Sequence, residues 1–346
     1  VFVGQVPTNL RHRESFQELD IVELSRPVTK WAVELNRADR VAEIGDKAFH
    51  IANSGRPGPV VISLPEDIDR SSTAQHSLWR YSTVGIPSPS TKGVVKAVSM
   101  IEDAERPCIV AGEGILRIDA TDKLVCFAEC LGAPVFTAWR RFDAFPNKHP
   151  LYMGGLNLSS VSNDLSEPLK NADLIIAIGT RLDEFTTLSY SSPSTEQKII
   201  HIDRSPEETG GSWIGADLSL VADAGEAMDK LEETLKNSMR AKPSKAHQKQ
   251  IADWSEYYRS RTTPRSNRIG LKDGTIDLEG VYHDILNIIP DDASITCDAG
   301  DFGSWLIRYY KWNQPRTFFG PTTGAMGYAL PAAIAAKLAR PQAPVI

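Results

Sequence analysis

The 346 residues have an ordinary globular composition, with 41% hydrophobic and 24% charged residues. This excludes a disordered tail, a collagen-like fibre and a disulfide-stapled mini-protein. Lys and Arg total 38 against 44 Asp and Glu, and the net charge of −6 disfavours a nucleic-acid-binding protein. The apolar stretches are too short to span a membrane. We expect about two to three domains, a cytoplasmic location, and neither nucleic-acid nor membrane partners.

The cysteines and histidines show no metal-ligand pattern. Cys126 and Cys130 lie one helical turn apart, but Cys108 and Cys297 do not form the second close pair that a metal site would need. The seven histidines have no ligand spacing either. We expect buried, reduced thiols and structural histidines.

The first block extends to about Asp69. Apolar residues from 42 to 51 recur at helical spacing, and the Gly- and Pro-rich stretch 55–59 ends that helix. The β-branched run 60–64 predicts a strand buried on both faces. From Ser71 to Ser90 the composition shifts to Ser, Thr, Pro and Gly, which indicates a linker.

The second block, from about Thr91 to Asn237, alternates strand-like and helical segments. The predicted strands are 108–111, 134–137, 174–178, 198–202 and 218–222, and the predicted helices are 120–131 and 226–236. This alternation predicts an α/β fold, a doubly wound parallel sheet covered on both faces. Ligands of such sheets bind at the carboxyl ends of the strands, where several glycines and acidic residues fall.

A basic segment follows the second block. Between Arg240 and Asp273, nine Lys or Arg stand against three Asp or Glu. Nucleic-acid binding is one interpretation. We favour a solvated linker helix, with Trp254, Tyr257 and Tyr258 packing on one face, because no recognition motif accompanies the charge.

The third block starts near Ile276. The pattern predicts a helix over 278–289 and a strand-like run over 293–297. The turn Asp298–Gly303 leads into a helical stretch near 304–310, and the glycine-rich stretch 324–327 leads into an Ala-rich helix over 328–339.

Two strand–glycine–helix junctions are candidates for binding an anion: 112–114 and 298–303. Glycines allow the backbone to approach a phosphate, and the N–H groups of a helix start point toward it. Each junction is equally well explained as an ordinary tight turn. Arg117 stands where the third glycine of a dinucleotide fingerprint would fall, and the carboxylate of Asp301 would repel phosphate.

Several short motifs form one ordered series along the chain. They are Gly4-Gln5-Val6-Pro7, Ser15-Phe16-Gln17-Glu18, Thr29-Lys30-Trp31, Gly55-Arg56-Pro57-Gly58-Pro59-Val60, Leu64-Pro65-Glu66-Asp67, Gly179-Thr180-Arg181-Leu182-Asp183, His201-Ile202-Asp203 and Gly324-Ala325-Met326-Gly327-Tyr328-Ala329-Leu330-Pro331-Ala332-Ala333. This order resembles the thiamine-diphosphate-dependent enzymes, most closely the large catalytic subunits of acetolactate synthase and their relatives. The resemblance covers essentially the whole chain.

The resemblance implies a complete central Rossmann-like domain flanked by two partial domains. The implied boundaries are 1–75 for the C-terminal part of a pyrimidine-binding domain, 76–90 for a linker, 91–240 for the central domain, 241–275 for a second linker and 276–346 for the N-terminal part of a diphosphate-binding domain. The chain is therefore expected to be an internal fragment, inactive on its own.

The resemblance also implies a cofactor, thiamine diphosphate, that stabilises a carbanion during decarboxylation of a 2-oxo acid. Met326 matches the apolar residue that supports the bent cofactor, and the Gly324 carbonyl matches the acceptor for its amino group. A core methionine is the alternative. Three residues match the turn that contacts the diphosphate: Gly300, Asp301 and Phe302. Gly327, directly after Met326, is a further cofactor-binding candidate. The family often has a neutral donor at the Asp301 position, which leaves that side-chain contact in doubt.

Phe16 and Gln17 match residues of the substrate channel, contributed across a dimer interface, so a homodimer or homotetramer is expected. Both residues are alternatively plain packing residues. The glutamate that activates the pyrimidine ring is expected before Val1, and the Gly-Asp-Gly…Asn motif that holds Mg²⁺ after Ile346. No catalytic or metal-binding residue is therefore assigned within this chain.

Acetolactate synthases carry a structural FAD, and six residues fall on positions that contact it: Arg56, Gly112, Gly114, Gly179, Arg181 and Asp203. Three departures weaken FAD binding and acetolactate chemistry. A Gly-Met-His-Gly loop is replaced by residues 157–160, Phe185 stands where an arginine is expected, and Glu66 replaces a channel lysine, which inverts the field on a 2-oxo acid.

The sequence thus predicts an acetolactate-synthase-like transferase or lyase that uses thiamine diphosphate and Mg²⁺ to decarboxylate a 2-oxo acid or to join it to a second carbonyl. The alternative is a non-catalytic assembly module whose central domain holds FAD or ADP structurally.

Overall fold

The computed structural model describes residues 1–73, 84–210, 214–236, 244–266 and 274–346. Residue contacts divide the chain into two compact units, Val1–Ile86 and Pro87–Ile346. The division falls within the segment 76–90, and residues 76–83 of that segment lie outside the described part.

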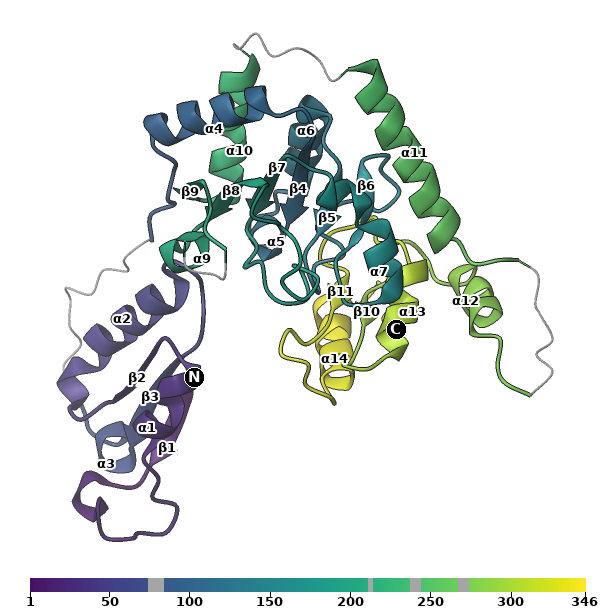
Figure 1. Ribbon diagram of the computed structural model, residues 1–346. Helices are drawn as coiled ribbons and strands as arrows, with labels where there is room; N and C mark the ends of the chain where they lie inside the picture. Colours follow the sequence, from purple (N-terminus) through teal and green to yellow (C-terminus); the bar gives the residue numbers. More distant parts are fainter. Residues whose placement is uncertain (74–83, 211–213, 237–243, 267–273) are drawn as a thin grey trace. The chain divides into compact units, whose positions relative to one another are not determined.

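The first unit is built on a three-stranded parallel sheet with the order β1-β3-β2 (Figure 1). Its strands are β1 (Phe2–Gln5), β2 (Trp31–Glu34) and β3 (Val60–Pro65). Its helices are α1 (Ile21–Ser25), α2 (Val41–Asn53) and α3 (Glu66–Asp69), with 3-10 turns at Thr8–Leu10, Arg26–Val28 and Ala38–Arg40. Ile44 and Ala48 of α2 are buried in one cluster with Val60 and Ile62, which confirms the predicted helix and strand.

The second unit contains a six-stranded parallel sheet with the order β6-β5-β4-β7-β8-β9. The strands are β4 (Pro107–Ala111), β5 (Val135–Thr137), β6 (Tyr152–Gly155), β7 (Leu174–Ile178), β8 (Lys198–Asp203) and β9 (Leu218–Val221). All five predicted strands are present, and β6 was not predicted.

Helices cover both faces of this sheet, as the continuous apolar strands required. They are α4 (Thr91–Asp103), α5 (Glu113–Arg117), α6 (Thr121–Leu131), α7 (Ser160–Leu165), α8 (Glu167–Lys170), α9 (Pro206–Gly210) and α10 (Ala224–Lys236). On one face Ile109 and Ile176 pack in a large cluster with Phe127 and Leu231. On the other face Cys108 and its neighbours form a second cluster. The predicted doubly wound α/β fold is confirmed.

The basic segment contains a helix, α11 (Lys245–Thr262). Its buried face is formed by Ile251, Ser255, Tyr258 and Thr262, spaced three or four residues apart. The prediction that Tyr257 packs on this face was wrong. Its neighbour Tyr258 occupies the helix face toward β6, which leaves Tyr257 pointing to solvent, 46% exposed.

The C-terminal segment holds a two-stranded parallel sheet against the central one. Its elements are α12 (Leu278–Leu286), β10 (Ile295–Thr296), α13 (Phe302–Tyr309), β11 (Phe318–Phe319) and α14 (Ala329–Ala339). Figure 1 shows β10, β11 and α14 beneath the β5 end of the central sheet. The helix expected over 278–289 ends at Leu286, and the strand expected over 293–297 has only two ladder residues, extended by a bridge from Ser294 to Val345.

The expectation of buried thiols holds for Cys108 and Cys297 and was wrong for Cys126 and Cys130, which are exposed. Leu124, Phe127 and Leu131 occupy the core face of α6, so Cys126 and Cys130 lie on its opposite side.

Candidate functional site

The predicted diphosphate turn connects β10 to α13. Gly300 and Asp301 form this turn, their carbonyls accept the N–H groups of Gly303 and Ser304 at 3.0 Å, and α13 begins at Phe302. No side chain caps the first turn of α13, so its N–H groups present the positive end of the helix dipole. A Cβ atom at Gly300 would lie 2.4 Å from the Phe302 ring. The predicted diphosphate turn therefore lies at the positive end of a helix dipole, while the N–H groups of Gly303 and Ser304 are engaged within the turn.

The second predicted cofactor segment precedes α14. Gly324 and Gly327 adopt left-handed conformations with φ of 73° and 82°, which other residues reach only with strain. Met326 lies between them and is 83% exposed. Met326 is therefore not a core residue of this chain, which excludes the alternative of a core methionine within it.

Asp298 joins the two cofactor segments. Its Oδ1 accepts the N–H of Ala329 at 2.8 Å. This bond, supported by the N–H groups of Gly327 and Tyr328, lowers the pKa of the carboxyl group. The turn after β10 and the start of α14 are thus tied by one side chain. Sequence analysis placed Asp298 at the start of the candidate junction 298–303 but assigned its side chain no role.

Three of the proposed nucleotide-contacting glycines meet at the carboxyl ends of β4 and β7. A Cβ at Gly112 would lie 2.4 Å from the carbonyl oxygen of Gly179, and one at Gly179 would lie 2.5 Å from Cα of Gly114. These glycines therefore allow two backbone turns to pack directly against each other.

The N–H groups of the same glycines are already engaged. Gly112 donates to Ile178, Gly114 to Gly179 and Gly179 to Ile202, at 2.8 to 3.0 Å. They cannot at the same time cradle a phosphate. Of the remaining predicted residues in this unit, Asp203 accepts the N–H of Ser205 at 2.9 Å and Arg181 is exposed. Arg56 follows α2 in the first unit. The residues present do not fit an FAD diphosphate.

His201 stabilises the same region. Its Nε2 lies 2.7 Å from the carbonyl oxygen of Thr180, and burial is the main cause that lowers its pKa. A neutral ring that donates from Nε2 to this carbonyl holds the turn after β7. This is a structural role.

Phe16 and Gln17 lie at the tip of a loop in the first unit. Phe16 is 89% exposed, so it is not a plain packing residue of this chain. His12, Glu14 and Gln17 all have left-handed backbone conformations, which are uncommon outside glycine. The loop therefore needs specific bonds to hold its shape.

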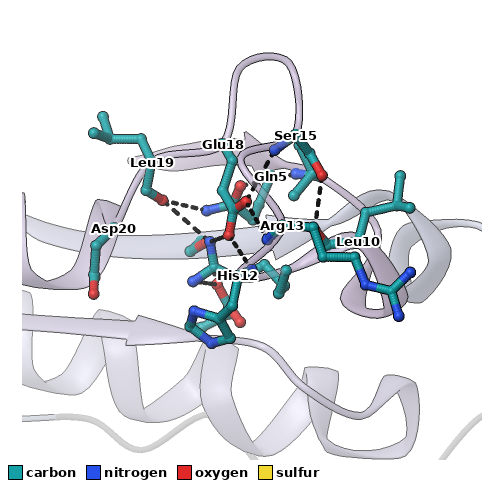
Figure 2. Close-up of polar contacts among 12 residues, drawn as sticks. Gln5, Leu10, His12, Arg13, Ser15, Glu18, Leu19 and Asp20 are labelled. Atoms are coloured by element: carbon teal, nitrogen blue, oxygen red, sulfur yellow. Dashed lines mark hydrogen bonds and ion pairs between the residues drawn. The ribbon is translucent and has the colours of Figure 1, made fainter.

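Glu18 supplies those bonds. Figure 2 shows N–H groups converging on its carboxylate from His12 at 2.6 Å, Ser15 at 3.2 Å and Arg13 at 3.4 Å. The bond from His12 is the main cause that lowers the pKa of Glu18, and Arg11 adds an ion pair at 3.5 Å. One side chain thus fixes the loop that presents Phe16 and Gln17.

From its sequence, the polar cluster 140–143 is expected to form a solvated or salt-bridged loop, with anion binding as the alternative. The structure shows that the solvated loop was largely wrong. Arg140 and Asp143 are buried, and Phe142 is fully enclosed. Asp143 accepts the N–H groups of Thr317 and Phe318 at 2.9 and 3.2 Å. Only Arg141 forms the expected kind of contact, an ion pair with Glu113. The loop is buried because it packs against the C-terminal segment.

Glu66, which stands at the position of a channel lysine, starts α3 and pairs with Arg70 at 2.5 Å.

Within the described ranges, no group of three or more His, Cys, Asp or Glu side chains is arranged to hold a metal ion. In the same ranges, no helix combines the length and apolarity needed to cross a membrane.

Comparison with protein families gives two matches. Residues 94–231 match the central domain of thiamine pyrophosphate enzymes, and residues 298–346 match their C-terminal TPP-binding domain. The fold is similar to the X-ray structure of a Mycobacterium smegmatis protein described as thiamin diphosphate-dependent, with a TM-score of 0.77 and 22% identity over 99% of this chain and 64% of that one.

Curated relatives extend the match along the whole chain. The acetolactate synthase large subunits of Buchnera aphidicola and Corynebacterium glutamicum are 30% and 31% identical over 100% and 98% of this chain. Isozyme 3 of Escherichia coli is 28% identical over 100% of it. The chain spans 54 to 60% of the lengths of these relatives. The chain belongs to the thiamine pyrophosphate enzymes and is homologous to acetolactate synthase large subunits along its full length.

Proposed function

We propose that the full-length protein is a thiamine-diphosphate- and Mg²⁺-dependent enzyme that decarboxylates a 2-oxo acid or joins it to a second carbonyl compound. The observation that carries this proposal is the bond between Asp298 and Ala329, which brings the predicted diphosphate turn and the Met326 segment into one site. The homology to acetolactate synthase large subunits supports it.

When bound, thiamine diphosphate supplies the electron sink for carbanion chemistry. The residues of this chain bind and orient it. The N-terminal turn of α13 would hold the diphosphate, Met326 would support the cofactor from its apolar side, and the carbonyl of Gly324 would accept a hydrogen bond from its amino group.

The remaining parts of the proposed enzyme come from outside the residues assigned above. The resemblance puts the activating glutamate and the Mg²⁺ motif beyond this chain, so the chain alone is proposed to be inactive. Phe16 and Gln17 are proposed to line the substrate channel of a second copy, in a cytoplasmic homo-oligomer. The exposure of Phe16 supports this role.

Acetolactate formation itself is the less favoured reaction within this class. Glu66 gives the position of the channel lysine a negative charge, and Arg70 compensates it at 2.5 Å. A site without a fixed positive charge attracts a small 2-oxo acid anion less strongly. The charge at Glu66 therefore weighs against acetolactate chemistry and does not by itself select another 2-oxo acid.

A panel of 2-oxo acids, with product identification, tests this function in the full-length protein. Release of CO₂ that requires both thiamine diphosphate and Mg²⁺ is expected for at least one substrate. Met326→Ala should lower turnover, and Met326→Leu, which keeps an apolar support of similar volume, should retain most of it. Cofactor binding without turnover of any 2-oxo acid would reject the proposed reaction.

A further inference from the structure

Arg140 follows β5 in the central sheet and reaches into the C-terminal segment. It is buried, 5% exposed, with a left-handed φ of 60°. Its guanidinium donates to the carbonyls of Cys297 at 3.5 Å and Asp298 at 3.3 Å. These carbonyls belong to the chain between β10 and the diphosphate turn.

The same guanidinium also lies close to the backbone that follows β11. A Cβ atom at Gly320, just after β11, would lie 2.3 Å from Nη1 of Arg140. The ring of Trp139 lies 4.8 Å from the guanidinium carbon, and Phe185 stacks on that ring at 4.3 Å. Arg140 is therefore held between an aromatic pair of the central domain and both strands of the small sheet.

Arg140 is connected to the start of α14 through one residue. It donates to the backbone carbonyl of Asp298, and the carboxylate of Asp298 accepts the N–H of Ala329. A displacement of Asp298 thus changes the position of both cofactor segments at once.

The loop has other anchors that hold the C-terminal segment without Arg140. Asp143 binds the N–H groups of Thr317 and Phe318, and Asn147 accepts the N–H of Trp312 at 3.1 Å. These bonds lie away from Asp298. Burying a charged guanidinium costs free energy, and the described hydrogen bonds of Arg140 end on neutral carbonyls rather than on a carboxylate. Packing alone is therefore a poor explanation for an arginine at this position.

We propose that Arg140 is a positioning residue of the cofactor site, which sets the distance between the diphosphate turn and the Met326 segment through Asp298. The proposal rests on the assignment of the chain to the thiamine pyrophosphate enzymes and does not depend on the identity of the substrate.

The test compares Arg140→Met with Arg141→Met in the full-length protein. Both variants remove one guanidinium from adjacent positions, but Arg141 contacts Glu113 and the backbone carbonyl of Arg140 rather than the cofactor segments. Two quantities are measured: the dissociation constant of thiamine diphosphate with Mg²⁺, by calorimetry, and the hydrogen exchange of the Ala329 N–H in the cofactor-free protein. Thermal melting of each variant reports on folding.

Arg140→Met should weaken cofactor binding about 10- to 100-fold and speed exchange at Ala329, as other residues that orient a binding group do. Arg140→Lys, which can reach only one of the two carbonyls, should fall between wild type and Met, and it replaces the Met variant if that one fails to fold. The proposal would be overturned if Arg140→Met melted at a lower temperature but had the same cofactor dissociation constant and the same Ala329 exchange rate as Arg141→Met. Cofactor binding is measured by calorimetry and does not depend on turnover. A wild-type protein that binds the cofactor but turns over no 2-oxo acid would therefore reject the proposed reaction, and the comparison of the Arg140 and Arg141 variants would still test the role of Arg140.

Discussion

Asp298 and Ala329 are joined by a 2.8 Å hydrogen bond from a backbone N–H to a carboxylate oxygen. The two residues lie on either side of β11, one after β10 and the other at the first position of α14. This bond connects two motifs that are separated in sequence, the turn 298–303 and the glycine-rich segment 324–327 that leads into α14.

Removing the Asp298 carboxylate should therefore weaken cofactor binding. Asp298→Ala is expected to raise the dissociation constant of thiamine diphosphate about 10- to 100-fold. Asp298→Asn keeps one acceptor oxygen and should have a smaller effect. Calorimetric titration measures both. Asp292→Ala, an exposed carboxylate on the same segment, serves as the control, and an equal effect in the control would contradict the assigned role.

Glu18→Gln should loosen the loop that carries Phe16 and Gln17. An amide presents one acceptor oxygen where the carboxylate presents two, so at least one of the bonds from His12, Arg13 and Ser15 is lost. Faster hydrogen exchange at residues 12–15 is the expected result.

The matched control for this loop is Glu14→Gln, since Glu14 is an exposed neighbour of the same type. The pKa of Glu18 is lowered mainly by the His12 N–H. The ionised carboxylate therefore stabilises the loop above the pKa of the unfolded state, and this stabilisation is lost as the pH falls through the pKa of the folded state. The protection of the amides of residues 12–15 in the wild type, measured relative to the intrinsic exchange rate at each pH, should accordingly fall below about pH 4.5. Exchange that does not differ between the two variants would exclude Glu18 as the organiser.

Asp143→Asn should increase stability near neutral pH. Burial raises the pKa of Asp143 from 3.8 to about 6. The protonated carboxyl group of Asp143 therefore contributes to the free energy of unfolding below the unfolded pKa, and this contribution is lost as the pH rises through 6. The loss is about 3 kcal/mol. Asparagine keeps an oxygen for Thr317 and Phe318 without the buried charge. Denaturant unfolding at several pH values measures the effect, and a variant less stable than wild type at pH 7 would refute this explanation.

Gly179→Ala should destabilise the central domain. The new Cβ would lie 2.5 Å from the backbone of Gly114, and residue 179 has a φ of 60°. Overpacking together with a left-handed conformation predicts a loss of about 1–4 kcal/mol in the free energy of unfolding. Gly215→Ala, where nothing lies within 4 Å of the added Cβ, should be close to neutral. Comparable losses in both variants would contradict the packing argument.

The purified full-length protein should carry no flavin. The N–H groups of Gly112, Gly114 and Gly179 are engaged by backbone carbonyls, and a phosphate cannot replace them without breaking the contact between β4 and β7. The visible absorbance spectrum decides this directly. Flavin at one equivalent per chain would show that the two turns separate to admit it.

The central sheet was predictable because its strands are continuous apolar runs, and burial on both faces leaves a clear signal. The run 174–178 is fully buried as β7. The strand β6 has no such signal, because Gly154 and Gly155 replace half of its side chains. The two-residue strands β10 and β11 are defined by tertiary pairing, which a local pattern does not encode.

The cofactor segments were found from motifs, but the residues that position them were not. Asp298 and Arg140 act through bonds to backbone groups 31 and 158 residues away. Glu18 belongs to a motif, but its role depends on the left-handed turns of the loop that it binds. Arg140 looked like one charge in a polar cluster. Only the packing of the C-terminal segment on β5 shows that it is buried.

Calorimetric titration of the full-length protein with thiamine diphosphate in the presence of Mg²⁺ tests the central claim most directly. Saturable binding of one cofactor per chain, weakened by Asp298→Ala and by Arg140→Met, is the predicted result. Absence of binding at millimolar cofactor would contradict it.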